Sequence, residues 1–260
     1  MQLTGKRIFV TGCASGIGAG TVRAFVREGA LVSAIDINDI TGEQVVSDAN
    51  AQGTGQATYY HCDITQRDQV FEVFQRAEET MGGLDVLANV AGVESAKPAA
   101  EVDAEDIQAI FSININGTIY TNQAACQLMQ RQKQGAIINF SSDAALSGMP
   151  NSAVYAASKG AVLSWTKTIA YEWGVKYNIR CNSVCPAIKT PMYDAWLAGL
   201  SEAERNAHLQ SEKLRVPIGG SMGDVDKDMA PVMVFLASDG SGFIDGQIFC
   251  VNGGRNMVRG

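Results

Sequence analysis

Histidine and paired cysteines are scarce in this sequence. Its 260 residues include only two histidines, and its six cysteines are scattered without a C-x-x-C pair. Zinc sites need cysteine or histidine ligands at regular spacings, and a disulfide framework needs regularly spaced cysteines that can pair. We therefore expect neither a disulfide framework nor a metal site. The cysteines are interpreted as small core residues of a cytoplasmic protein, because a reducing compartment keeps thiols free.

An excess of basic residues is also missing. The formal net charge is −7, whereas nucleic-acid binding needs a positively charged surface. No apolar run reaches the length of a membrane span, and the first residues enter a strand pattern without the layout of a signal peptide. We expect no nucleic-acid partner and no association with a membrane.

No linker, low-complexity tract or internal repeat divides the chain. Its composition, 46% apolar and 18% charged residues, is typical of a soluble globular protein. The length suits one large α/β domain with a substantial core. We predict a single domain over residues 1–260.

Short apolar segments alternate with helical segments along the chain. This alternation predicts an α/β fold, a doubly wound Rossmann-type parallel sheet of about seven strands with helices on both faces. The predicted strands lie at residues 7–11, 30–36, 57–62, 84–92, 135–142, 178–185 and 246–254.

Glycines at positions 12, 16 and 18 lie between the first strand and a helix expected to reach Arg27. Gly12 allows a tight turn, Gly16 lets the backbone approach a phosphate, and Gly18 lets the helix pack closely on the strand. The free N–H groups and positive dipole of the helix start suit a pyrophosphate. The alternative is a glycine-rich turn that binds no ligand.

Asp36 ends the second strand, eighteen residues after Gly18. A carboxylate here accepts hydrogen bonds from two ribose hydroxyls and repels a 2′-phosphate. No Arg or Lys lies in the glycine turn or at positions 37 and 38. We therefore predict NAD rather than NADP as the cofactor. The alternative role for Asp36 is to cap the next helix.

Other polar residues and glycines follow later strands or lie in the helices between them. Asp63, Asn89 and Gly92 come at predicted strand ends, where ligands bind in open parallel sheets, although Asp63 could instead cap a helix. Asn114 lies inside a long helix predicted over residues 104–131. Asparagine is an indifferent helix former, so we expect either a polar role beside the sheet or exposure to solvent.

Tyr155 and Lys159 lie four residues apart in an alanine-rich segment that we predict to be helical, and so share a face. A nearby positive charge favours the phenolate, so we expect Lys159 to lower the pKa of Tyr155. That change suits a general acid or base near neutral pH. Ser142 would present its hydroxyl from the preceding strand end. An ordinary helical pair without chemistry is the alternative.

Residues 190–222 interrupt the alternation with two short helical pieces. We interpret this insertion as a substrate lid, because long insertions beside a ligand site are usually functional. Trp196 and Leu200 would either close over an apolar substrate or pack within the insertion. The final helix and strand offer an apolar edge suited to self-association.

Taken together, these residues resemble the short-chain dehydrogenase/reductase family over essentially the whole chain. The matching elements are the glycine turn from Thr11, the segment N-V-A-G from Asn89, the set Asn114, Ser142, Tyr155 and Lys159, and the segment Pro186–Thr190. Val90 and Ala187 depart from the family's asparagine and glycine, and we expect both changes to be tolerated.

The resemblance implies an enzyme in which Tyr155 exchanges a proton with the substrate oxygen during hydride transfer at the nicotinamide C4. It implies that Lys159 holds the nicotinamide ribose, Ser142 the substrate oxygen and Asn114 a relay water. It also implies a homo-oligomer, a tetramer. The cofactor contacts that it implies are Gly12, Ser15, Gly16, Ile17, Gly18, Asp36, Ile37, Asp63, Ile64, Asn89, Ala91, Gly92, Tyr155, Lys159, Pro186, Ile188 and Thr190.

The leading functional hypothesis is an NAD(H)-dependent oxidoreductase that interconverts a secondary alcohol and a ketone. A 3-oxoacyl-thioester reductase is the alternative, although it usually goes with NADP and an acidic carrier protein, which Asp36 and the negative net charge disfavour. A catalytically silent NAD-binding sensor or scaffold would typically lack a member of the catalytic set, and none is missing here.

Contacts to the small-molecule substrate are predicted for the residues around the catalytic set. If Glu94 and Asp143 line the mouth of the pocket, a substrate with hydroxyls or a cationic nitrogen is favoured. The alternative is that both are exposed loop acids. The full predicted set is Ser142, Asp143, Glu94, Met149 and Trp196.

Overall fold

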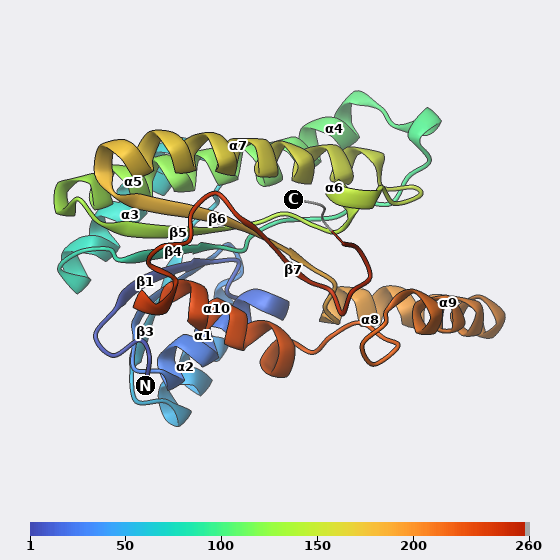
Figure 1. Ribbon diagram of the computed structural model, residues 1–260, viewed down its shortest axis with the longest axis horizontal. Helices are drawn as coiled ribbons and strands as arrows, with labels where there is room; N and C mark the ends of the chain where they lie inside the picture. The colour runs from blue at the N-terminus through green and yellow to red at the C-terminus, as the bar shows by residue number, and fades with distance from the viewer. Residues whose placement is uncertain (258–260) are drawn as a thin grey trace.

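The computed structural model describes residues 1–257 and shows a parallel sheet between two layers of helices (Figure 1). Residues 258–260 of the predicted domain lie outside the described residues. The seven strands follow the order β3-β2-β1-β4-β5-β6-β7, which confirms the predicted doubly wound architecture. Their bounds are β1 (Arg7–Thr11), β2 (Leu31–Asp36), β3 (Gln56–His61), β4 (Val86–Asn89), β5 (Gly135–Phe140), β6 (Ile179–Pro186) and β7 (Ile248–Val251).

Both faces of the sheet are covered, which explains the nearly continuous apolar runs of its strands. Consecutive side chains of β1 point to opposite faces: Ile8 and Val10 enter one apolar core, and Phe9 enters the other. Helices α1 (Gly16–Arg27), α2 (Asp39–Gln52) and α10 (Ala230–Ala237) cover the first face, and α3 (Arg67–Met81), α5 (Thr118–Gln132) and α7 (Ala153–Tyr177) cover the second (Figure 1).

The helix predicted over residues 104–131 is present, but its centre is not α-helical. It consists of α4 (Ala104–Phe111), the π-helical segment η2 (Ser112–Gly117) and α5. The sequence pattern predicted the helix but not this change of helix type at its centre. A π-helical turn accommodates an extra residue in the helix and often occurs at a functional site. Here it contains Asn114.

A chain of buried polar side chains crosses the middle of the sheet. Thr11 Oγ1 donates to Asn89 Oδ1 at 3.0 Å, and Asn89 Nδ2 donates to Asn139 Oδ1 at 3.3 Å. Asn139 and Asn122 exchange two amide hydrogen bonds of 2.8 and 2.9 Å, and Asn139 Nδ2 also donates to Thr166 Oγ1 at 3.0 Å. These five residues form a network, which we call the amide chain, that joins β1, β4 and β5 to helices α5 and α7.

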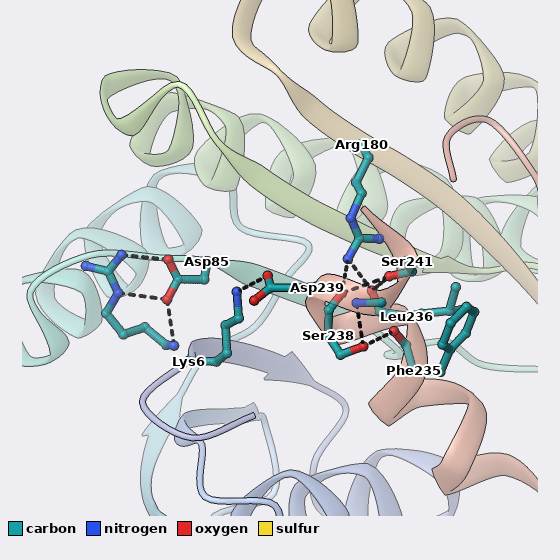
Figure 2. Close-up of polar contacts among 10 residues, drawn as sticks. Lys6, Asp85, Arg180, Phe235, Leu236, Ser238, Asp239 and Ser241 are labelled. Carbon is teal, nitrogen blue, oxygen red and sulfur yellow. Dashed lines mark hydrogen bonds and ion pairs between the residues drawn. The ribbon is translucent and has the colours of Figure 1, made fainter. Parts of the chain in front are cut away.

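At the amino ends of the strands, which we call the amino edge, an ion pair and side-chain hydrogen bonds to carbonyl oxygens hold the sheet and α10 together. Lys6 Nζ lies 2.6 Å from Asp239 Oδ1, and Arg180 donates to the main-chain carbonyl oxygens of Leu236 and Ser238 at the end of α10 (Figure 2). A guanidinium group is well suited to capping the last carbonyls of a helix. These contacts lie at the amino ends of the strands, so they leave the carboxyl ends of the strands free to bind a ligand.

The insertion at residues 190–222 contains the two predicted helices. They are α8 (Pro191–Ala198) and α9 (Glu202–Arg215), and they extend to one side of the sheet (Figure 1). Across residues 1–257, no helix has both the length and the apolar character needed to cross a membrane.

Candidate functional site

The glycine turn and the segment after β4 meet at the carboxyl edge of the sheet. β1 and β4 are neighbours there, and the direction of chain progression reverses between them, which is where such sheets bind ligands. Gly12 has a φ of +71°, and a Cβ on it would lie 2.8 Å from Ala91 Cα. A Cβ on Gly18 would lie 1.9 Å from Gly12 O. Both positions therefore require glycine.

The start of helix α1 is open toward this edge. Its N-cap Ser15 is exposed, and within residues 1–257 its side chain makes no capping hydrogen bond. The first N–H groups of the helix, around Ile17, thus remain available to an anion. A Cβ on Gly16 would lie 3.5 Å from Thr190 Cβ, so the segment after β6 closes over the glycine turn.

Asp36 is held beside the glycine turn by two main-chain N–H groups. Its Oδ2 accepts from Ala14 N–H at 2.9 Å, and its Oδ1 accepts from Asn38 N–H at 3.0 Å. Asn38, rather than Asp36, caps α2 by accepting from Thr41 N–H, which removes the capping alternative. Each carboxylate oxygen keeps capacity for a further donor. Ile37 beside it is 61% exposed.

Asp63 orders the turn before α3. Its Oδ1 accepts from the N–H and the hydroxyl of Thr65 at 2.9 and 2.8 Å. Burial raises the pKa of Asp63, but hydrogen bonds from Thr65 and Gln66 outweigh it and leave the pKa below its ordinary value. The neighbouring Ile64 is buried against Gly117. These contacts do not test the contact between Asp63 and the cofactor, which stays a prediction.

Residues 187–189 pair with Gly223 through main-chain hydrogen bonds. Gly223 N–H donates to Ala187 O at 3.0 Å, and Lys189 N–H donates to Gly223 O at 2.8 Å. These two bonds pair the residues on either side of Ile188, so the N–H and C=O of Ile188 point the other way. That arrangement, the open start of α1 and the fixed Asp36 fit a nicotinamide dinucleotide.

Tyr155 and Lys159 lie on one face of α7, as the sequence predicts. Lys159 is 5% exposed, its Nζ donates to Phe140 O at 3.0 Å, and Nζ lies 5.9 Å from the centroid of the Tyr155 ring. Ser142 follows β5 nearby and is partly buried, and its Oγ accepts from Ala144 N–H at 3.1 Å. The structure thus brings together a phenol, an ammonium group and a hydroxyl.

The expected lowering of the Tyr155 pKa is wrong for the protein alone. Burial raises the pKa of Tyr155 to about 12, a hydrogen bond with Ser142 opposes the rise, and the negative charge of Glu94 adds to it. Burial also lowers the pKa of Lys159 to about 8. Desolvation outweighs the attraction that we expected, so the phenol keeps its proton at neutral pH and is set to donate it.

Asn114 is fully buried, which removes the solvent-exposed alternative. Its Oδ1 accepts from Val93 N–H at 2.9 Å, and its Nδ2 donates to Val93 O at 2.8 Å and to Ser158 Oγ at 3.0 Å. Ser158 lies between Tyr155 and Lys159 on α7. Asn114 therefore ties the loop after β4 to the helix that carries these two residues.

Gly92 lets this packing form. A Cβ on Gly92 would lie 2.9 Å from Lys159 Nζ and 3.1 Å from Asn114 Oδ1. Asn89, by contrast, is buried within the amide chain, where it supports the site from below. Asn122 and Asn139 of that chain were missed in the sequence, although amides inside otherwise apolar segments are a signal of such a network.

Comparison with known proteins agrees with this geometry. A family model described as enoyl-(acyl carrier protein) reductase matches residues 12–256. The chain is 36% identical to a 3-oxoacyl-(acyl-carrier-protein) reductase of Thermotoga maritima, covering 98% of this chain and 99% of the relative. It is 33% identical to a 2,3-dihydro-2,3-dihydroxybenzoate dehydrogenase of Bacillus subtilis, with coverages of 98% and 97%.

Solved structures show the same fold. A short-chain type dehydrogenase/reductase from Mycobacterium ulcerans superposes with a TM-score of 0.90 at 28% identity, over 98% of this chain and 91% of the other. An NAD⁺-bound xylitol dehydrogenase superposes with a TM-score of 0.91 at 27% identity, over 98% and 100%. This chain belongs to the short-chain dehydrogenase/reductase family.

The residues predicted to contact the substrate differ from one another in how far they are buried. Asp143 is 7% exposed, and its Oδ1 accepts from Asn252 Nδ2 at 2.9 Å. Burial raises its pKa, opposed by hydrogen bonds from Asn252 and Asn256. Asp143 is therefore not an exposed loop acid, and it does not line the mouth of a pocket. It is buried and anchors the C-terminal segment. Met149 is partly buried in the turn before α7.

Glu94 is exposed to solvent, and its carboxyl group lies beside Ser152, the N-cap residue of α7. Burial of that group raises the pKa of Glu94, opposed by a hydrogen bond to Ser152 and by the charge of Lys159. Trp196 is 47% exposed, and its ring packs edge-on against His208 with 4.8 Å between centroids. Packing within the insertion is therefore one role of Trp196.

The cysteines of this short-chain dehydrogenase/reductase match their interpretation as core residues. All six are free, and five are buried, with Cys250 partly exposed. Burial raises the pKa of every one of these thiols. They are unsuited to act as nucleophiles at neutral pH.

Proposed function

We propose that the protein is an NAD(H)-dependent oxidoreductase that interconverts a secondary alcohol and a ketone. The observation that carries this proposal is the arrangement of the Tyr155 phenol beside the Ser142 hydroxyl and the buried ammonium group of Lys159. A ketone oxygen that gains negative charge during reduction needs hydrogen-bond donors and a proton source. The cofactor supplies or accepts the hydride when bound.

In this mechanism the chain's own residues hold and move one proton. Ser142 and Tyr155 donate hydrogen bonds to the substrate oxygen, and in ketone reduction Tyr155 gives up its proton as the alkoxide forms. Lys159 stabilises the resulting phenolate by its charge. Asn114 fixes the loop and helix that carry these groups, and its Oδ1 retains capacity for a water. The residues that would hold the cofactor are the predicted set from Gly12 to Thr190.

Replacing Asp36 with asparagine is expected to weaken the preference for NAD. The substitution removes a negative charge that disfavours a 2′-phosphate and one acceptor for the ribose hydroxyls. We expect KM for NAD⁺ to rise about tenfold, equivalent to about 1.4 kcal/mol. The ratio of kcat/KM with NAD to kcat/KM with NADP should fall by more than this factor. The measurement is initial rates with each cofactor. Asp48→Asn, an exposed change on α2, is the matched control.

The substrate class is tested with both cofactors against secondary alcohols, diols, polyols, hydroxysteroids and 3-hydroxyacyl thioesters. A strong NAD preference with one active class supports the proposal. NADH binding without turnover of any member, unchanged by Tyr155→Phe, points instead to a silent cofactor-binding protein.

A 3-oxoacyl-thioester reductase is the second candidate. It is favoured by the 36% identity to the Thermotoga maritima 3-oxoacyl-(acyl-carrier-protein) reductase. Asp36 and the net charge of −7 oppose it, because the first disfavours NADP and the second repels an acidic carrier. Activity confined to NADPH and acyl thioesters would place this candidate first.

Glu94 is the residue that we propose selects the substrate. The N–H and C=O of Val93 are held by Asn114, and Lys97 N–H donates to Asn151 O at 2.6 Å. Glu94 is thus fixed between two anchors that flank the start of α7. Its carboxyl group favours a substrate with an additional hydroxyl or a cationic nitrogen.

Glu94→Gln is expected to raise KM about tenfold for such substrates, equivalent to about 1.4 kcal/mol, and to leave KM for a simple ketone nearly unchanged. The Glu94 charge raises the pKa of Tyr155, so its removal lowers that pKa. The rising limb of the pH profile for alcohol oxidation, which needs the phenolate, should move to lower pH. An equal KM change for all substrates would contradict this role.

We also propose a cytoplasmic homo-oligomer, a tetramer by family resemblance. An apolar hollow of about 350 Å³ lies between α5 and α7 and is lined by Ile115, Ile119 and Trp165 among others. A second copy of the chain could cover it. Light scattering after size-exclusion chromatography measures the oligomeric state directly.

A further inference from the structure

Helix α9 buries a single residue, and that residue is a glutamate. Among the residues of this fully described helix, only Glu212 is buried, at 3% exposure. A carboxyl group usually avoids the interior unless it is paired, because removing it from water is unfavourable. The placement of Glu212 therefore needs an explanation other than apolar packing.

The Glu212 carboxyl contacts both helices of the insertion and the C-terminal segment. Tyr193 OH on α8 donates to Oε2 at 3.4 Å, and the same hydroxyl lies 3.0 Å from His208 Nε2 on α9. Arg255 Nη1 lies 3.4 Å from Oε1, and His208 Nε2 lies 4.0 Å from it. Yet Oε1 has no hydrogen-bond partner among the described residues. The carboxyl is held chiefly by charge.

One set of contacts leads from Glu212 to the cofactor turn. Tyr193 lies in the first turn of α8, and its N–H donates to Thr190 Oγ1 at 3.3 Å. Thr190 is the residue that faces Gly16, where a Cβ would come within 3.5 Å of it. A shift of Tyr193 would therefore move the part of α8 that closes over the glycine turn.

The other set leads to the catalytic strand end. Arg255 belongs to the same short segment as Asn252, whose Nδ2 donates to Asp143 Oδ1 at 2.9 Å. Asp143 directly follows Ser142. The segment is also tied to the end of the insertion, because Ile218 N–H donates to Gly253 O at 2.9 Å.

We propose that Glu212 is a positioning residue that holds helices α8 and α9 closed over the site through Tyr193 and Arg255. One buried carboxyl group thereby fixes the position of Thr190 on the cofactor side. Through the C-terminal segment it also fixes the position of Ser142 on the substrate side. This role rests on the proposed function, since it assigns these two sides to cofactor and substrate.

Weakening the contact lowers the fraction of molecules in which α8 and α9 are closed. The apparent affinity of a ligand that needs the closed form falls in proportion to that fraction. Once both ligands are bound, the closed form is favoured again, so chemistry is little changed. The signature is a rise in KM with a much smaller change in kcat.

The test is Glu212→Gln, which keeps the volume and removes the charge, with Glu202→Gln on the exposed start of α9 as its matched control. We expect KM for NAD⁺ and for the alcohol to rise about tenfold, with kcat changed by less than about threefold. Arg255→Met should reproduce this result, Arg255→Lys should restore most of the affinity, and the double variant Glu212→Gln/Arg255→Met should be no worse than either single change.

Two measurements on the protein without ligands follow closure directly. Trp196 packs on His208, so its fluorescence reports on the packing of α8 against α9. Subtracting the spectrum of the same protein with Trp196→Phe isolates the signal of Trp196. That signal should differ from wild type in Glu212→Gln and equal it in Glu202→Gln. Protease cleavage within residues 190–222 should accelerate in Glu212→Gln and stay unchanged in Glu202→Gln.

The outcomes separate the two proposals. Lower thermal stability with unchanged KM, fluorescence and cleavage would show a merely structural role and overturn the inference, as would a fall in kcat without a rise in KM. If the wild-type protein binds no NAD, the proposed function fails, while fluorescence and cleavage still decide whether Glu212 holds the insertion closed.

Discussion

Tyr155→Phe is expected to lower kcat by about a hundredfold to ten-thousandfold while leaving the affinity for NADH nearly unchanged. The substitution removes one oxygen and with it the proton that the ketone oxygen must receive. The ring and its position over Lys159 remain, so the fold and the cofactor contacts should persist. Single-turnover reduction monitored by NADH absorbance measures the loss, and fluorescence titration with NADH measures the affinity.

Tyr171→Phe provides the matched control for this prediction. Tyr171 lies on the same helix α7 and is 78% exposed, so its hydroxyl should be dispensable. Turnover by Tyr155→Phe at the rate of the control would mean that another group delivers the proton. Alcohol oxidation needs the phenolate, so its rate should rise with pH toward the pKa of Tyr155, which is about 12 in the protein without ligands. Loss of the Lys159 ammonium above its pKa of about 8 acts in the opposite direction.

Asn139→Leu is expected to lower the free energy of unfolding by about 3 kcal/mol or more. Asn139 is fully buried and takes part in four hydrogen bonds of the amide chain. A leucine of similar volume leaves the amides of Asn89 and Asn122 short of partners in a dry interior. At roughly 2–4 °C per kcal/mol, the melting temperature should fall by about 6–12 °C in calorimetry.

Ser183→Ala tests whether burial of a polar group alone explains such a loss. Ser183 lies directly across from Asn139 on β6 and is 1% exposed, and its Oγ has no hydrogen-bond partner within residues 1–257. Its removal should therefore change the melting temperature little. Equal destabilisation by both substitutions would contradict the importance of the amide chain.

Local sequence patterns predicted the sheet and the glycine turn because backbone requirements act over short distances. Gly12 and Gly18 are needed by contacts within one strand–turn–helix unit and its neighbouring strand. Tyr155 and Lys159 share a face because of helical periodicity alone. These features could be predicted without knowledge of the rest of the chain.

The remaining features depend on residues far apart in the chain. Within the π-helical turn, the Asn114 amide is hydrogen-bonded to Val93 and Ser158, and periodicity does not reveal those partners. The burial of Asp143 depends on Asn252, more than a hundred residues later. The sign of the Tyr155 pKa shift depends on how much water the folded chain excludes, which a spacing of four residues does not determine.

The separation between the two edges of the sheet has a consequence for how such proteins change over generations. Lys6, Asp239 and Arg180 secure the amino edge through contacts that include none of the catalytic set. Substitutions in the loops of the carboxyl edge, including the position proposed here for substrate selection, Glu94, are therefore expected to change the substrate preference without destabilising the fold. Selection for a new substrate can therefore change residues at the carboxyl edge, while the contacts at the amino edge keep the fold stable.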